Sequence, residues 1–271
     1  MEDLHFEWEE IDLQKDTLLS CDKEGALCGY AAVLPWGAVD ARYLIYDDLE
    51  LADDNLWSVL AEFCQGRAAA QIAAQIRKAS RAVTHISHSN ERHRRLIEEF
   101  GFSLSRYIFQ MQIPLDTLEG VPQLPTGYKL ATFRIGKDER AVYTVIHEAF
   151  TEPGREPQSF EDWKAFMMRA DLFNAELWQL AWHGEDLAGV CLGVPYPELG
   201  WIRQLGVSNQ HRRIGLGRTL LLAGFHALKQ NGYQKAGLTV HSKNPNAQAL
   251  YTSVGMTLRN QLDEYEKFFA V

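Results

Sequence analysis

Hydrophobic residues in the second half of the chain recur with two different periods. Where apolar and polar residues alternate, or apolar residues form a short run, the pattern predicts β-strands. These segments are 128–133, 177–182, 187–194, 201–207, 236–241 and 264–269. Where apolar residues recur every three or four positions, the pattern predicts helices with one buried face, over 138–150, 160–168, 215–230 and 246–254. The order β-α-α-β-β-β-α-β-α-β predicts a mixed sheet with helices on both faces.

The first half of the chain repeats the later part of this order. Asn90 and the Gly101-Phe102 pair match Asn244 and the Gly255-Met256 pair, and each match is separated by 154 positions (90 and 244, 101 and 255). A constant separation over several positions indicates an internal duplication. The first copy lacks the first strand and the two helices that follow it, because its predicted hairpin begins near residue 17.

A segment rich in proline and glycine, residues 114–127, separates the two copies and has neither a helical nor a strand period. We therefore predict an α/β (α+β) fold with two tandem domains, each a mixed, mostly antiparallel sheet flanked by helices. The predicted boundaries are 1–115 for the truncated first domain, 116–127 for the linker and 128–271 for the complete second domain.

Composition and charge exclude several classes of protein. The chain is 46% hydrophobic and 23% charged, as globular proteins are, and its net charge of −9 disfavours non-specific binding to nucleic acid. Its four cysteines form no CxxC pair, its first residues are acidic, and no apolar run is long enough to span a membrane. We expect a cytoplasmic protein, monomeric or homodimeric, that binds neither nucleic acid nor a membrane. The histidines at 85, 88 and 93 lack the accompanying ligands of a metal site, so we expect no metal.

A glycine-containing loop between a predicted strand and a predicted long helix carries the most specific chemical signal. It reads Arg212-Arg213-Ile214-Gly215-Leu216-Gly217-Arg218. Glycines allow backbone N–H groups to face a ligand without obstruction, and a helix N-terminus adds unpaired donors with partial positive charge. With three arginines nearby, the segment predicts a cradle for a diphosphate. The alternative is a glycine turn that merely precedes a core helix.

This loop resembles the acetyl-CoA diphosphate loop of the GNAT (GCN5-related N-acetyltransferase) superfamily. The segment Asn244 to Met256 resembles the second motif of that superfamily, with Met256 in place of its usual Phe. The resemblance covers residues 128–269. Two such halves in one chain are similar in layout to mycothiol synthase, and this similarity implies no particular substrate. It implies acetyl-CoA as cosubstrate. The residues that it implies for acetyl-CoA binding are Leu205, Gly206, Val207, Arg212, Arg213, Ile214, Gly215, Leu216, Gly217, Arg218 and Asn244.

The resemblance also implies roles around the thioester. Backbone groups of Leu205, Gly206 and Val207 would hold the pantetheine arm, and a bulge for which Gly206 is suited would direct an N–H at the thioester carbonyl. Tyr251 would be the general acid that protonates the departing CoA thiolate. The superfamily often carries a basic carboxylate on the strand that is residues 201–207 here, and this strand has none.

The nearest candidates for a general base are therefore Glu198, before this strand, and His241, at the end of the neighbouring strand. A chain of waters is the alternative to both. The region 150–168, between the first two strands, is where the resemblance implies selection of the acceptor.

The first copy lacks the residues of this chemistry. Its segment 50–57 contains no glycine and carries the consecutive acids Asp53 and Asp54, which would repel phosphates, and Ile97 stands where the second copy has Tyr251. We expect an acetyl-CoA-dependent N-acetyltransferase with an active C-terminal domain, in which a small amine or a peptide N-terminus attacks the thioester directly. A non-catalytic acyl-CoA-binding regulatory protein is the alternative.

Overall fold

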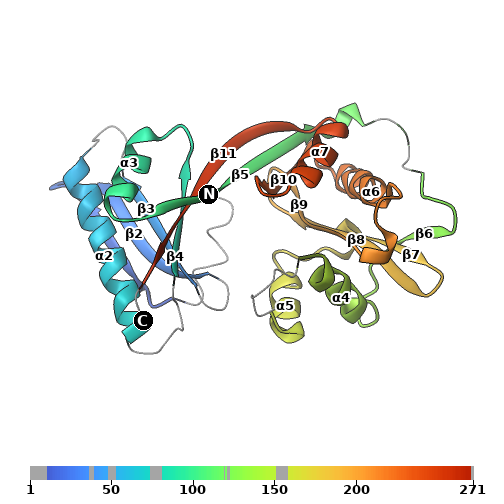
Figure 1. The fold of residues 1–271 in the computed structure, drawn as a ribbon, viewed down its shortest axis with the longest axis horizontal. Helices are drawn as coiled ribbons and strands as arrows, with labels where there is room; N and C mark the ends of the chain where they lie inside the picture. The colour runs from blue at the N-terminus through green and yellow to red at the C-terminus, as the bar shows by residue number, and fades with distance from the viewer. Residues whose placement is uncertain are drawn as a thin grey trace. The chain divides into compact units, whose positions relative to one another are not determined.

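The computed structural model of the chain describes residues 11–36, 40–47, 53–73, 81–118, 120, 123–150 and 158–269. The chain forms two compact units (Figure 1), of which the first comprises residues 1–108 with 260–271 and the second residues 109–259. Each unit has its own hydrophobic core, one centred on Trp57 and Tyr43 and the other on Trp178 and Phe225.

The second unit contains all the elements predicted for the second half except the last strand. They are β6 (Tyr128–Thr132), α4 (Glu139–Phe150), α5 (Phe160–Met167), β7 (Trp178–His183), β8 (Asp186–Pro195), β9 (Gly200–Val207), α6 (Leu216–Gln230), β10 (Lys235–His241) and α7 (Pro245–Ser253), with the short 3-10 helices η3 (Leu115–Thr117), η4 (Ala175–Leu177) and η5 (Asn209–His211). The strands β6 to β9 are successively antiparallel, whereas β9 and β10 run parallel. The predicted order of strands and helices in this half is confirmed.

The first unit is built from fewer elements. They are α1 (Leu13–Asp16), β1 (Thr17–Cys21), β2 (Leu27–Trp36), β3 (Asp40–Asp47), α2 (Asp54–Ala73), β4 (Arg81–Ser87) and α3 (Glu91–Glu99). The strand β5 (Ser103–Pro114) follows, and half of it belongs to each unit. Within the described residues, this copy has no counterpart of β6, α4 and α5, as the sequence predicts.

The internal duplication is visible in the bounds of the elements. The pairs β4 and β10, α3 and α7, and β5 and β11 (Thr257–Phe268) each begin and end 154 residues apart. The strands β3 and β9 also have equal lengths, and each precedes a long helix. The fold is therefore a tandem of two related α/β units, in agreement with the predicted fold class.

The last strand of each copy lies beside a strand of the other copy. Strand β11 pairs antiparallel with β4, from Leu262 opposite Ser87 to Phe268 opposite Arg81, and β5 lies next to β10. The compact units therefore divide the chain at Ile108 and Asn260, and not at the predicted domain boundaries of 115 and 128. Periodicity predicts a strand but not the neighbouring strands with which it pairs, because the pairing joins residues far apart in the sequence.

The predicted linker is anchored at its start. Leu115 of η3 is fully buried, and its N–H donates to the Gln234 carbonyl oxygen over 2.8 Å. The cysteines Cys21, Cys28, Cys64 and Cys191 are all free thiols. In the described part of the chain, no helix is long and apolar enough to cross a membrane.

Candidate active site of the second unit

The strands β9 and β10 pair over only part of their length. Their parallel register covers Gly200 to Ile202 opposite Ala236 to Leu238, although β9 continues to Val207 and β10 to His241. No strand pairing is described between the remaining residues. The main-chain groups on this edge of β9 are therefore available to a ligand that carries amide groups, since backbone N–H and C=O groups require partners.

A β-bulge lies where this pairing ends. Leu192 of β8 opposes Gln204 and the next residue, Gly193, opposes Ile202, so that Arg203 is the additional residue on β9. The predicted bulge at Gly206 is therefore wrong, because Gly206 opposes Val190 in regular register. Gly206 instead allows close helix packing: a Cβ on it would lie 3.2 Å from Ile146 and 3.3 Å from Ala149 of α4.

The loop after β9 has an unusual backbone. Gly215 has a φ of 86°, and Arg213, at 63°, is the only non-glycine with positive φ in the described part of the chain. Such a conformation costs about 1 kcal/mol or more for a residue with a Cβ, and it is concentrated at functional sites. The Arg212 Nε donates to the Val207 carbonyl oxygen over 2.9 Å, and the Asn209 N–H donates to the Glu148 carboxylate over 2.9 Å. These contacts fix the first part of the loop, between Val207 and Arg212.

The N-terminus of α6 is open. Gly215 occupies the N-cap position and supplies no side-chain hydrogen bond. Within the described residues, the backbone N–H groups of residues 212–218 donate to no protein acceptor. Arg212, Arg213 and Arg218 are exposed around these donors. Free N–H groups, the helix dipole and three guanidinium groups together fit a diphosphate.

Tyr251 lies on the helix beside this terminus. The Asn244 carboxamide oxygen caps α7 by accepting from the Ala247 N–H over 3.1 Å. Leu250 lies 3.8 Å from the Cβ position of Gly217, so α7 runs beside the first turn of α6. The Tyr251 side chain is 9% exposed, and burial, with Cys191 nearby, raises its pKa to about 12. In the described part of the chain its hydroxyl has no hydrogen-bond partner, so it is a neutral donor near neutral pH.

The two candidate bases do not lie together. Glu198 is exposed in the turn before β9, and His241 is exposed at the far end of β10. Since β9 and β10 are parallel and Ala236 opposes Gly200, these side chains stand at opposite ends of the strand pair, about 20 Å apart along it. At most one of them can act on a given acceptor amine. No carboxylate lies on β9 itself.

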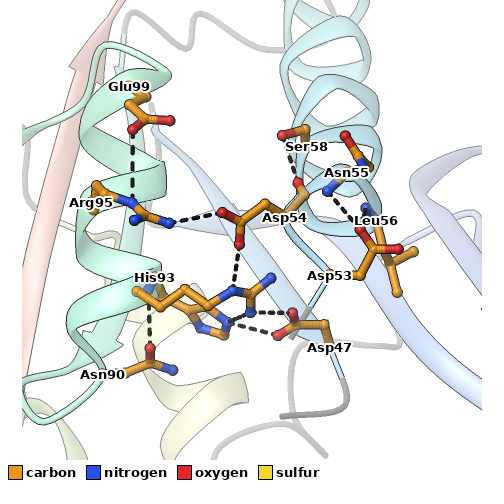
Figure 2. A network of polar contacts seen from close by, with 11 residues as sticks. Asp47, Asp53, Asp54, Asn55, Leu56, Ser58, Asn90, His93, Arg95 and Glu99 are labelled. Atoms are coloured by element: carbon orange, nitrogen blue, oxygen red, sulfur yellow. Dashed lines mark hydrogen bonds and ion pairs between the residues drawn. The ribbon is translucent and has the colours of Figure 1, made fainter. Parts of the chain in front are cut away.

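The corresponding place in the first unit is closed by charged side chains (Figure 2). Asp53 accepts from the N–H groups of Asn55 and Leu56, over 2.9 and 3.3 Å, and so caps α2. At the end of β3, the buried Asp47 pairs with Arg92 and His93 of α3, over 2.6 and 2.7 Å. The Asp53 carboxylate thus accepts from the first N–H groups of α2, whereas the corresponding N–H groups of α6 are open.

Several arginines and histidines of the first unit pair with acids. Arg92 pairs with the buried Asp47, and Arg94 is 3.9 Å from the buried Asp263. His85, His88 and His93 contact Glu264, Asp263 and Asp47 respectively. The sequence could not show these pairs because two of the acids arrive on the exchanged strand β11.

Arg203 and Gln204 were not singled out by sequence reasoning. A signal for them exists, since two consecutive polar residues interrupt the alternation of Trp201 to Val207, as a bulge does. Arg203 lies 4.6 Å above the Phe166 ring of α5. The Gln204 Oε1 is buried and has no hydrogen-bond partner in the described part of the chain.

Comparison with known proteins agrees with this geometry. Residues 140–256 match the model of the acetyltransferase (GNAT) family. A mycothiol acetyltransferase of Thermobispora bispora is 33% identical over 171 residues, which are 60% of this chain and 58% of that protein. The chain therefore matches little more than half the length of this relative.

Solved structures resemble a larger part of the chain. A GCN5-related N-acetyltransferase from Sphaerobacter thermophilus has a TM-score of 0.85 at 29% identity, over 96% of this chain and 83% of that one. A tandem GNAT protein from the clavulanic acid biosynthesis pathway has a TM-score of 0.67 at 17% identity, over 93% and 83% of the two chains. The second likeness concerns the fold alone.

Proposed function

Because the C-terminal region of this chain is a domain of the acetyltransferase (GNAT) family, we propose that the protein is an acetyl-CoA-dependent N-acetyltransferase whose second unit is active. The observation that carries this proposal is the open N-terminus of α6 beside Tyr251, at the place where β9 and β10 separate. Only the second copy combines these features within the described residues.

Each part of the site has a distinct task in this reaction. The N–H groups of residues 212–218 and the three nearby arginines bind the diphosphate of CoA. The edge of β9 between the bulge and Val207 binds the amide groups of the pantetheine arm, as an added strand would. The bulge at Arg203 interrupts the ladder near the reacting carbonyl, where a main-chain N–H would stabilise the developing oxyanion.

The chemistry is a direct transfer. The amine nitrogen attacks the thioester carbon, the C–S bond breaks, and Tyr251 gives its proton to the thiolate of CoA. Since the pKa of Tyr251 is raised to about 12, the phenol carries its proton throughout the neutral range. The proton of the amine leaves to Glu198, to His241 or to water, and Glu198→Gln and His241→Ala variants distinguish these routes.

The acceptor that we propose is a small amine or a peptide N-terminus. The experiment that tests the function measures thiol release from acetyl-CoA against a panel of amines, amino acids and N-terminal peptides, together with calorimetric titration of acetyl-CoA. We expect amine-dependent release and one acetyl-CoA bound per chain. Two bound molecules would contradict an inactive first unit.

One observation favours a second candidate function. The strand β9 carries no carboxylate to act as base, which is compatible with an acyl-CoA-binding regulatory protein without turnover. Tight binding of acetyl-CoA with no amine-dependent thiol release over the whole panel would select this candidate.

A further inference from the structure

Arg203 differs from several other half-buried arginines because, in the described part of the chain, no acidic side chain contacts it. Arg67, Arg81 and Arg106, which are also half-buried, contact carboxylates at 2.6, 2.8 and 2.8 Å. Within the described residues, Arg203 contacts only the Phe166 ring and the Tyr196 hydroxyl, the latter over 3.5 Å. Within the described residues, no carboxylate contacts the Arg203 guanidinium at the bulge. An arginine that is partly removed from water and stacked on an aromatic ring is well suited to bind an anion in a fixed orientation.

Gln204, the next residue, offers the complementary group. Its Oε1 is buried without a donor in the described part of the chain. Buried carbonyl oxygens of this kind are almost always hydrogen-bonded, so the position calls for an N–H or O–H from a ligand or a water. Gln204 and Gly206 are two residues apart on one strand and share a face, and Gly206 faces Ile146 of α4.

Both side chains therefore lie on the side of the sheet that α4 and α5 cover. Arg203 reaches Phe166 of α5, and Gln204 lies on the face that packs against α4. The bulge is what allows two consecutive residues to serve the same side, since a regular strand would direct them to opposite faces.

We propose that the acceptor amine carries a carboxylate, that Arg203 binds this carboxylate, and that the Gln204 Oε1 accepts a hydrogen bond from an N–H of the same molecule. This inference rests on the proposed function and narrows its acceptor to amines with an acidic group. A protonated amine without an acidic group would be repelled by the guanidinium, whereas the carboxylate restores the missing countercharge. Arg203 is thus a specificity-determining residue.

The test uses pairs of acceptors that differ only in a carboxylate or a carboxamide, with amines of equal basicity. Alanyl-aspartate amide and alanyl-asparagine amide are one such pair, and aspartate- and asparagine-containing tripeptide amides are another. We expect the full-length protein to prefer the acid in kcat/KM by about tenfold or more. Arg203→Gln should reduce this preference to within about twofold, and Arg203→Lys should restore part of it. A merely structural role would lower both rates together and leave their ratio unchanged.

A binding measurement separates this inference from the proposed function. Calorimetry of the protein with CoA and the N-acetylated acid or amide of each pair requires no turnover. We expect tighter binding of the acid by wild type and not by Arg203→Gln. Equal affinities and rates within each pair, or a preference that persists in Arg203→Gln, would overturn the role of Arg203. Absence of thiol release with every amine would contradict the proposed function alone, and the binding ratio would still decide the role of Arg203.

Discussion

The N-termini of α2 and α6 follow corresponding strands of two related copies, yet they are chemically opposite. At α2 the first N–H groups donate to the carboxylate of Asp53, whereas α6 begins at Gly215 with no side-chain cap. A residue that caps a helix stabilises the fold, and its absence leaves donors for a ligand. The two copies show how one helix start serves stability in one unit and diphosphate binding, as we propose, in the other.

The second difference concerns the helix that follows the next strand. Tyr251 of α7 corresponds to Ile97 of α3, and both side chains are buried. Only the tyrosine brings a proton donor to this place. The first copy has instead gained the Asp47, Arg92 and His93 pairs beside α3, where burial is the main cause that lowers the pKa of His93 although Asp47 opposes it.

Removal of the Tyr251 hydroxyl should have the largest effect on activity. We expect Tyr251→Phe to lower kcat by about 10²-fold, because general acid catalysis contributes at least that much. The dissociation constant of acetyl-CoA should change by less than about twofold. Steady-state kinetics and calorimetry measure the two quantities, and Tyr233→Phe in the same unit is the control. An equal loss of binding and turnover would show that the tyrosine is structural.

A carboxylate at the α6 terminus should make it resemble α2. Gly217 has ordinary φ, and a Cβ on it would have only ordinary contacts, the nearest 3.7 Å away at Val207. We therefore expect Gly217→Asp to fold and to weaken acetyl-CoA binding about tenfold or more through repulsion of the diphosphate. Gly217→Ala is the matched control and should bind within about threefold of wild type. Unchanged affinity in Gly217→Asp would place the diphosphate elsewhere.

The opposite change in the first unit should affect stability and not binding. Asp53→Ala removes the cap of α2 and should lower the free energy of unfolding by about 1 kcal/mol. Chemical denaturation measures this loss, with Asp53→Asn as a control that keeps the cap. The number of acetyl-CoA molecules bound per chain should remain one. A second binding event in Asp53→Ala would mean that the first unit needs only an open helix start.

The smallest expected effect concerns pH and the exchanged strand. Burial alone would raise the pKa of Glu264, but hydrogen bonds from His85 and Arg106 outweigh it and hold it at about 2. A depressed carboxyl pKa stabilises the fold above its unfolded value, so this contribution should be lost as pH falls from about 4.5 towards 2. Glu264→Gln should show a flatter fall of Tm between pH 5 and pH 3 than wild type. A parallel fall in both proteins would contradict the role of Glu264.

The sequence predicted much of the second unit because α4 and α6 have regular apolar faces and β7 and β8 are continuous buried strands. Val142, Val145 and Ile146 of α4 are all buried, as the spacing requires. The positions of β5 and β11 could not be predicted, since the alternation of their residues does not specify the strands beside which they lie. The bulge at Arg203 was missed because a glycine, Gly206, is the more familiar bulge residue.

Part of the candidate site could also be predicted from the sequence, because it is formed by contiguous motifs. The loop and Tyr251 lie in contiguous motifs, and their local geometry follows from Gly215 and from the Asn244 cap. The ion pairs of the first unit join residues far apart in the chain, such as Arg106 and Glu264, and no local spacing encodes them.

The exchange of β5 and β11 makes the two copies mutually dependent for folding. A fragment that ends in the linker lacks the partner that β4 has in β11, and a fragment that begins there lacks β5 beside β10. We therefore expect that neither half folds as a separate module when the chain is divided in the proline-rich segment. Because of the exchange, loss of the first copy would remove β5 and leave β10 of the second copy with an unpaired edge.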